Sequence, residues 1–284
     1  MTSRRPLREV MARGNPALAF GAHDALTAVL GERAGFDAIW ASGFGISTTM
    51  ALPDLNLLGM SDHLVSVRRM AAACGLPVLA DVDCGFGGPL NLAYAVMMYE
   101  QAGVGGICVE DQQFPKTNSF VSGRQQLVDA DEFAAKVEAG KRAQQGRDFM
   151  LVARTEAMIC GRGVDEALRR AHRYVDAGAD AVLVHSSSDD PREVIEFLRR
   201  WGGKTPAVVI PTTYVTLSAQ RAGAEGAAMV VYANQALRAA VRAISEVATA
   251  VRADRSTRGV ESRIATLDAV FEITDLHGWL DLER

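Results

Sequence analysis

The 284-residue sequence predicts an α/β protein, a (β/α)8 TIM barrel followed by an additional C-terminal helical segment. Three observations support this prediction. Eight short apolar runs alternate with segments of helical spacing, Ala-Gly pairs precede several of the runs, and polar residues follow the runs where strands would end. Because a barrel uses this length of chain as one unit, we expect one domain over residues 1–284, with residues 255–284 as its helical extension.

The Ala-Gly pairs indicate repeated helix-to-strand units. A glycine in the left-handed conformation commonly ends a helix, and an uninterrupted apolar run is typical of a strand buried on both faces. The pairs stand at residues 34–35, 102–103, 177–178 and, more loosely, 222–223. The expected strands are 18–22, 36–40, 77–81, 106–110, 149–154, 181–185, 207–211 and 228–232. Helical spacing marks 90–102, 130–143, 164–177 and 191–201.

An open, doubly wound sheet is the alternative fold. It is disfavoured because no GxGxxG motif opens the first helix. The tail carries an apolar stripe that must be buried, either on its own barrel or on a neighbouring subunit, and that stripe consists of Leu267, Val270, Phe271, Ile273 and Leu276.

Composition excludes several classes of protein. Hydrophobic residues make up 49 % of the chain and the formal charge is −4, which argues against disorder and against a basic nucleic-acid surface. We find no membrane-spanning apolar run and no signal peptide, so we expect no membrane partner. The four cysteines lack CxxC spacing, which favours reduced thiols in a cytoplasmic enzyme over disulfides or structural zinc.

Polar side chains follow the predicted strands. In a barrel the C-terminal ends of all strands meet at one mouth, where catalytic groups lie. For each of these polar residues alone, a structural role is as good an explanation as a functional one. Their number at one mouth favours a functional role. They are His23 and Asp24, Ser42, Asp81 and Asp83, Glu110 and Asp111, Arg154 to Glu156, His185, and Thr212 and Thr213.

Three acidic residues at this mouth predict a divalent cation. Asp81 and Asp83 are two positions apart and point to the same side of an extended strand end, and Glu110 ends the next strand. Carboxylates this close repel one another unless a cation intervenes, and oxygen ligands favour Mg²⁺, or alternatively Mn²⁺, over zinc. Arg154 and His185 add positive or hydrogen-bond-donating groups, so we also expect a small anionic substrate.

Residues 110–125 form a long polar connection that predicts a lid. Loops of this length at a barrel mouth often close over the substrate. Lys116, Asn118 and Ser119 are the side chains that we expect to close over the substrate and exclude water.

These segments resemble the phosphoenolpyruvate mutase branch of the isocitrate lyase/phosphoenolpyruvate mutase superfamily, over about residues 18–251. The lid is the most specific part: that branch carries Glu-Asp-Lys, five further residues, then Asn-Ser. Gln112 takes the place of the first lysine, and Cys84 stands where threonine is common. The superfamily's lyases carry a lid cysteine that this chain lacks, which disfavours carbon–carbon lyase activity. The lid residues kept here are Glu110, Asp111, Lys116, Asn118 and Ser119. The other matching segments are 21–24, 39–44, 53–56, 81–87, 153–157 and 211–214.

The resemblance implies a reaction that interconverts phosphoenolpyruvate and phosphonopyruvate by moving phosphorus between the enol oxygen and C3. It implies that Asp81 holds Mg²⁺ while Asp83 and Glu110 order its water ligands, and that Asp54 faces the migrating phosphorus, either as nucleophile or as electrostatic guide. The implied catalytic residues are Asp54, Lys116, Asn118, Ser119, Arg154 and His185. The implied substrate-binding residues are Trp40, Ser42, Gly43, Phe44, Asn118, Ser119, Arg154 and His185.

Two other functions remain open. Phosphonopyruvate hydrolase, a sister activity in which water captures the phosphoryl group, resembles this chain except that threonine matches Asn118, so Asn118 favours the mutase. A catalytically inactive barrel serving as an assembly subunit is disfavoured, since such a subunit has no need of the acidic and basic groups at the mouth. The resemblance also implies a homotetramer in which neighbours exchange their C-terminal helices.

Overall fold

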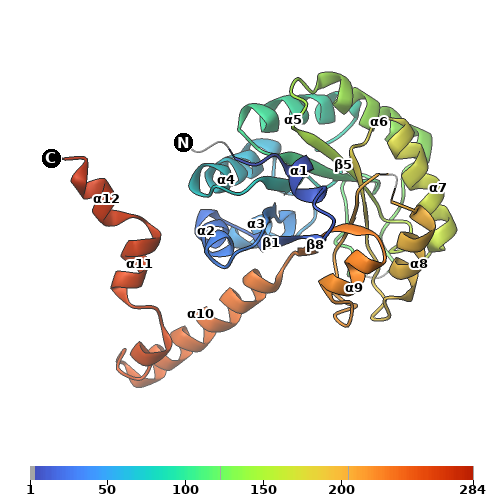
Figure 1. Cartoon of the computed structure of the whole chain (residues 1–284). Coiled ribbons are helices and arrows are strands. Elements are labelled where there is room, and N and C mark those ends of the chain that lie inside the picture. The colour runs from blue at the N-terminus through green and yellow to red at the C-terminus, as the bar shows by residue number, and fades with distance from the viewer. Residues whose placement is uncertain (1–3, 122, 204, 284) are drawn as a thin grey trace. The chain divides into compact units, whose positions relative to one another are not determined.

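The computed structural model describes residues 4–121, 123–203 and 205–283. The chain divides into two compact units, Met1–Asn234 and Gln235–Arg284. In the first unit eight parallel strands, paired in chain order from β1 to β8 and back to β1, form a closed barrel with helices between the strands (Figure 1). The predicted (β/α)8 barrel is therefore confirmed.

The elements of the first unit alternate along the chain. Its strands are β1 (Ala17–Ala22), β2 (Ala38–Ala41), β3 (Val78–Asp81), β4 (Gly106–Glu110), β5 (Met150–Thr155), β6 (Ala181–Val184), β7 (Ala207–Val209) and β8 (Ala227–Tyr232). Its helices are α1 (Leu7–Met11), α2 (Ala25–Arg33), α3 (Gly43–Thr49), α4 (Met60–Ala73), α5 (Pro89–Gln101), α6 (Ala130–Ala143), α7 (Gly163–Asp176), α8 (Arg192–Trp201) and α9 (Ala219–Ala224).

Three of the four Ala-Gly pairs end a helix as predicted. Gly35, Gly103 and Gly178 have φ angles of 84°, 74° and 101°, in the left-handed region that favours glycine. The fourth prediction was wrong, because Gly223 lies within α9, and the left-handed residue that follows this helix is Gly226, with a φ of 105°.

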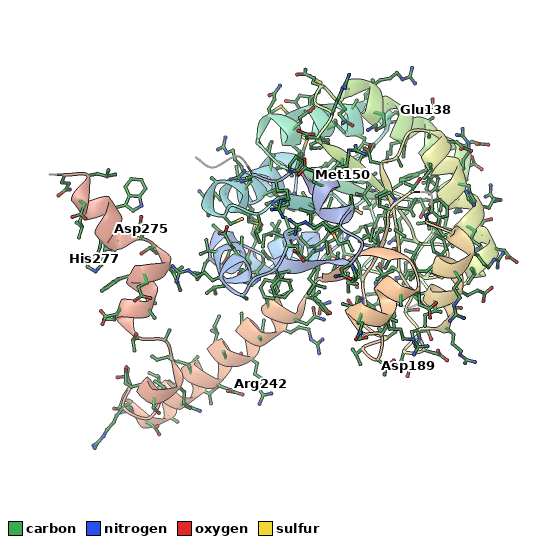
Figure 2. The ribbon with its side chains drawn as sticks, in the orientation of Figure 1. Glu138, Met150, Asp189, Arg242, Asp275 and His277 are labelled. Atoms are coloured by element: carbon green, nitrogen blue, oxygen red, sulfur yellow. The ribbon has the colours of Figure 1, made fainter. Side chains whose placement is uncertain are left out.

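The core has an inner and an outer layer because successive strand residues point to opposite faces. Inside the barrel, Trp40 and Leu79 pack with Met150, which Figure 2 labels. Ile39 and Val78 instead face outward, into the layer between strands and helices. Leu7 of α1 packs with the inner cluster, as do Val10 and Met11.

The second unit consists of α10 (Gln235–Asp254), the 3₁₀ turn η1 (Glu261–Arg263), α11 (Leu267–Ile273) and α12 (Leu276–Asp281). It includes the predicted helical tail together with α10. Large apolar side chains of this unit are exposed in the single chain, among them Val241, Ile244, Leu267, Val270, Trp279 and Leu282. No helix in the described ranges has both the length and the apolar character needed to cross a bilayer.

Candidate active site

A narrow cavity of about 50 Å³ lies at the C-terminal ends of the barrel strands. Ten of the thirteen predicted site residues line it: Trp40, Ser42, Phe44, Asp54, Asp81, Lys116, Asn118, Ser119, Arg154 and His185. Of the other three, Asp83 contacts Lys116 and Glu110 contacts Arg154. A Cβ atom on Gly43 would stand 2.9 Å from Asp83 Oδ1, so glycine permits the close approach of these two segments.

The lid is closed over Asp54. Lys116 Nζ lies 3.0 Å from Asp54 Oδ1 and also forms an ion pair with Asp83. Asn118 Nδ2 donates a hydrogen bond to the other Asp54 oxygen at 2.8 Å. Both oxygens of this buried carboxylate are therefore held by lid residues, which fixes the orientation of Asp54 toward the cavity.

Asn56 connects the same region from the loop that carries Asp54. Its side-chain amide donates to Asp83 Oδ2 at 2.9 Å, and its side-chain oxygen accepts from the Lys116 backbone N–H at 2.6 Å. Asn56 and Asp83 both have positive φ angles, 55° and 51°. Non-glycine residues held in this region occur preferentially at functional sites.

Arg154 organises the opposite side of the cavity. Its Nε donates to Glu156 Oε1 at 2.6 Å, and one terminal nitrogen donates to Ser119 Oγ at 2.8 Å. The other terminal nitrogen lies 3.3 Å from Glu110 Oε2. Ser119 Oγ in turn donates to Glu156 Oε2 at 2.7 Å, so a lid hydroxyl joins the arginine to its buried carboxylate partner.

Asp111, the residue after Glu110, supports this side from behind. Its carboxylate accepts from the backbone N–H of Glu156 at 2.8 Å and from the side chains of Thr155, Arg170 and Tyr174 at 3.0, 3.0 and 2.6 Å. Four donors on one buried carboxylate fix the backbone that presents Glu156 and Arg154.

Burial determines the charge of several groups here. It raises the pKa of Asp83 to about 7, against the opposing effect of Lys116, and it raises the pKa of Glu110 well above its usual value, with Arg154 opposing. Burial and the nearby Arg154 lower the pKa of His185 to about 4, so this ring is neutral at pH 7. Of the two roles expected for His185, positive group or neutral hydrogen-bonding group, the structure favours the second.

The carboxylates of the mouth fit a magnesium ion that keeps most of its water ligands. Among the described residues, no three His, Cys, Asp or Glu side chains are grouped to hold a metal directly. Asp81, however, lines the cavity, and the buried carboxylates of Asp83 and Glu110 form ion pairs with the cavity-lining Lys116 and Arg154. Mg²⁺ commonly takes one or two carboxylates and several waters, which matches one cavity-lining carboxylate with two neighbours.

Some predicted mouth residues have local structural roles. Asp24 caps α2 by accepting from Thr27 N at 2.7 Å, and His23 contacts the Thr27 hydroxyl at 3.1 Å. Ser42 lines the cavity and also caps α3, since its hydroxyl accepts from Gly45 N at 3.1 Å.

Asn56 and Glu156 have clear roles in the site that the sequence alone did not predict. Both lie within segments of the family resemblance, and Glu156 also follows a predicted strand, which was the available signal.

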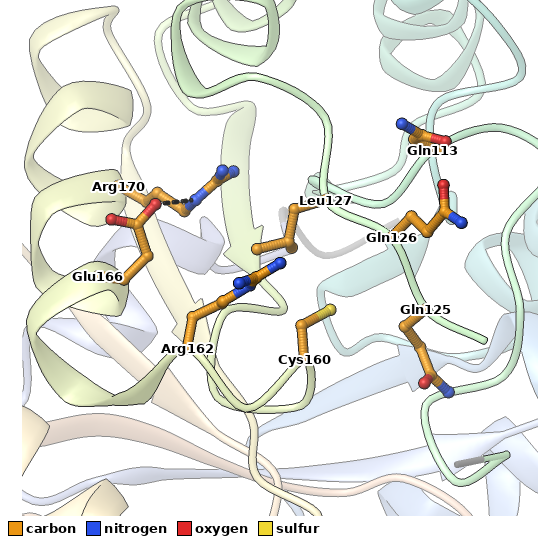
Figure 3. Close-up of a pocket in the computed structure, with 8 residues that line it drawn as sticks. All are labelled: Gln113, Gln125, Gln126, Leu127, Cys160, Arg162, Glu166 and Arg170. Carbon is orange, nitrogen blue, oxygen red and sulfur yellow. Dashed lines mark hydrogen bonds and ion pairs between the residues drawn. The ribbon is translucent and has the colours of Figure 1, made fainter. Parts of the chain in front are cut away.

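A second, larger cavity of about 720 Å³ lies outside the mouth, beside the two ends of the lid. Figure 3 shows Gln113, Gln125, Gln126 and Leu127 from the lid ends on one side and Arg162 on the other. Arg170 and Glu166, also shown there, are joined by an ion pair of 2.7 Å.

Comparison with known proteins agrees with this geometry. The family model described as phosphoenolpyruvate phosphomutase matches residues 7–252. A phosphonopyruvate hydrolase from Variovorax sp. (strain Pal2) is 44% identical over 98% of this chain and 96% of its own. The crystal structure of a phosphoenolpyruvate phosphomutase from Streptomyces platensis subsp. rosaceus superposes with a TM-score of 0.96, at 46% identity over 98% of this chain and 96% of that one.

A third relative, a phosphonopyruvate hydrolase in complex with oxalate and Mg²⁺, superposes with a TM-score of 0.93, at 39% identity over all of this chain and 98% of that one. The match of the family model extends over the whole barrel and the mouth described above. The chain therefore belongs to the phosphoenolpyruvate phosphomutase family, within the isocitrate lyase/phosphoenolpyruvate mutase superfamily of enzymes.

Proposed function

We propose that this protein is a phosphoenolpyruvate mutase, which interconverts phosphoenolpyruvate and phosphonopyruvate. The observation that carries the proposal is the closed lid on Asp54, with Lys116 on one carboxylate oxygen and Asn118 on the other. Phosphorus can move between the enol oxygen and C3 without loss only where water is excluded. The lid holds the Asp54 carboxylate and narrows the cavity, and both features favour the exclusion of water.

The remaining groups suit a small, highly charged substrate. Arg154 presents a guanidinium to the cavity, which is suited to bidentate contact with a carboxylate or phosphoryl group. Ser42 and the neutral ring of His185 add hydrogen-bonding groups. Asp81 would hold Mg²⁺, with Asp83 and Glu110 ordering its waters, and the ion, when bound, stabilises negative charge that develops on the substrate oxygens.

Asp54 is placed to act on the phosphoryl group. The Lys116 ammonium offsets the negative charge of Asp54 and so reduces the repulsion between this carboxylate and an anionic substrate. Fixed in this way, Asp54 either attacks phosphorus or guides a metaphosphate-like group from oxygen to carbon.

Phosphonopyruvate hydrolysis is the second candidate. It is favoured by the 44% identity to the Variovorax hydrolase over nearly the whole chain. The two activities share substrate and site and differ in whether water reaches the phosphoryl group. Asn118 favours the mutase because its amide donates to Asp54 at 2.8 Å, whereas a threonine hydroxyl stands one bond nearer the backbone.

Phosphorus NMR separates these functions. The protein is incubated with phosphonopyruvate and Mg²⁺, and phosphoenolpyruvate as the product supports the mutase. Inorganic phosphate and pyruvate as products would instead establish hydrolysis. Absence of any turnover would favour the catalytically inactive barrel. Asn118→Thr should raise the share of phosphate, whereas Val121→Thr, on an exposed lid residue, should not.

We further propose a cytoplasmic homotetramer in which neighbours exchange their C-terminal helices. The exposed apolar side chains of the second unit support burial against another subunit. The four cysteines are free thiols, which suits a reducing compartment. Small-angle scattering that gives the mass of a monomer would contradict the assembly.

A further inference from the structure

The two aspartates of the mouth belong to a loop with an unusual backbone. We call residues 81–87 the aspartate loop. Positive φ angles of 51°, 76°, 60° and 142° occur at Asp83, Gly85, Phe86 and Gly87. Two of these residues are not glycine, and such residues keep this conformation only where the surrounding contacts hold it. The contacts of the loop therefore determine where its two carboxylates lie.

Two hydrogen bonds link residues within the loop. Gly85 N donates to Val82 O at 2.8 Å, which closes a tight turn. Asp83 N donates to Asp81 Oδ1 at 3.4 Å, so the two aspartates are joined to each other. Neither bond involves the carbonyl of Cys84, which lies between Asp83 and Gly85. That carbonyl therefore takes a donor from elsewhere in the fold.

Lys136 supplies that donor from α6, which Figure 1 labels. Its Nζ donates to Cys84 O at 2.6 Å. The half-buried side chain lines a cavity of about 410 Å³ together with Gly87 and Gly88, and this cavity is separate from the mouth. Lys136 thus reaches the aspartate loop from outside the space in which a substrate would lie.

The bond from Lys136 acts on the peptide group that follows Asp83 by one residue. A hydrogen bond from a charged donor is stronger than one between neutral groups, so it holds the Cys84 carbonyl in one direction. The orientation of this carbonyl is coupled to the left-handed conformation on either side of it, at Asp83 and Gly85. Without the donor, Asp83 and Phe86 can relax toward negative φ angles, and the two carboxylates then lose their relative placement.

We propose that Lys136 is a positioning residue that holds the aspartate loop through the Cys84 carbonyl and thereby keeps Asp81 and Asp83 arranged for a divalent cation. The inference rests on the metal site of the proposed function and deepens it. Removal of a group that orients metal ligands from behind commonly weakens metal binding about 10–100-fold. Loss of the Lys136 ammonium should therefore weaken binding of the ion and leave the side chains that face the substrate in place.

The test compares Lys136→Met, Lys136→Arg and the control Lys141→Met with the wild-type protein. Lys141 lies on the same helix, and its Nζ pairs with Asp180 Oδ2 at 2.6 Å, so its loss does not touch the aspartate loop. Binding of Mn²⁺ to metal-free protein, followed by the EPR signal of the free ion, reports the site without any turnover. A titration of phosphonopyruvate turnover with Mg²⁺ gives the concentration of Mg²⁺ at half the maximal rate.

The two measurements should change together in one variant. Lys136→Met should raise the Mn²⁺ dissociation constant and the half-saturating Mg²⁺ concentration about tenfold or more, while the rate at saturating Mg²⁺ stays close to that of the wild type. Lys136→Arg keeps a charged donor and should bind Mn²⁺ much as the wild type does. Lys141→Met should match the wild type in both. If circular dichroism shows that Lys136→Met does not fold, Lys136→Gln, which is uncharged and shorter, carries the same expectation.

Each outcome decides a separate point. Wild-type Mn²⁺ binding in Lys136→Met would overturn the inference, even if its melting temperature were lowered, because Lys136 would then support only the fold. Binding weakened as much in Lys136→Arg as in Lys136→Met would also overturn it, since the charged donor would not be what matters. If the wild-type protein turns over no phosphonopyruvate, the proposed function fails, and Mn²⁺ binding still decides the role of Lys136.

Discussion

Replacing Lys116 by methionine tests whether the buried charges of the mouth depend on this one ammonium group. Lys116 is 5 % exposed, lies 3.0 Å from Asp54 and also pairs with Asp83. Methionine leaves both carboxylates buried without that partner, and removing one member of a buried ion pair costs about 3–5 kcal/mol. For a domain of this size, the melting temperature should fall by roughly 5–15 °C.

Calorimetry of metal-free protein measures this loss, and its pH dependence tests the cause. Burial raises the pKa of Asp83 to about 7, so at about pH 6 this carboxyl is mostly neutral in the wild type, and the difference between variant and wild type should shrink relative to about pH 8.5. Lys141→Met is the control, because Lys141 pairs with Asp180 at a more exposed site and should lose about 1 kcal/mol or less. A loss that equals the control, or that is the same at both pH values, would refute the reasoning.

Three further predictions concern Asp54, the divalent ion and the buried His63. Asp54→Ala should abolish turnover and keep the circular dichroism of the wild type; retained activity would remove Asp54 from the mechanism. Chelation of divalent ions with EDTA should stop turnover, Mg²⁺ should restore it, and full activity in EDTA would contradict the role given to Asp81. The buried His63, bonded to Tyr99 at 2.6 Å, has its pKa lowered from 6.5 to about 4, chiefly by burial. As the pH falls, His63 takes up a proton in the unfolded chain before it does so in the folded chain. Protonation of His63 therefore costs the fold no stability above about pH 7, and stability is lost as the pH falls from about 6.5 to 4. At pH 5 the free energy of unfolding should be about 2 kcal/mol lower than at pH 7. In urea unfolding, His63→Asn should show a smaller decrease between these two pH values than the wild type.

The barrel was predictable from the sequence because its signals are local. An apolar run and the glycine that precedes it report on the same few residues, and the four predicted helices have bounds within one residue of those observed. The exception is Gly223, which the Ala-Gly pattern predicts to end a helix but which lies within the short helix α9. No local signal distinguishes it from Gly226, three residues on, which takes the left-handed conformation.

The site was predictable as far as strand ends determine it. Asp81, Arg154 and His185 reach the mouth because parallel strands all end there. The contacts of Asn56 were not predictable, since its hydrogen bonds to Asp83 and to the Lys116 backbone join loops 27 and 60 residues away in sequence. Contacts between loops depend on conformations that no periodic pattern encodes. The hydrogen bond from Glu156 N to Asp111 is a contact of this kind.

The closed lid has a consequence for the order of events in the proposed reaction. While Lys116 and Asn118 hold Asp54, the lid covers a narrow cavity of about 50 Å³. Reactants that pass the lid on arrival and on departure require these bonds to break and form again in each turnover. Product release and the exclusion of water then depend on the same contacts, so a variant that loosens the lid should change both.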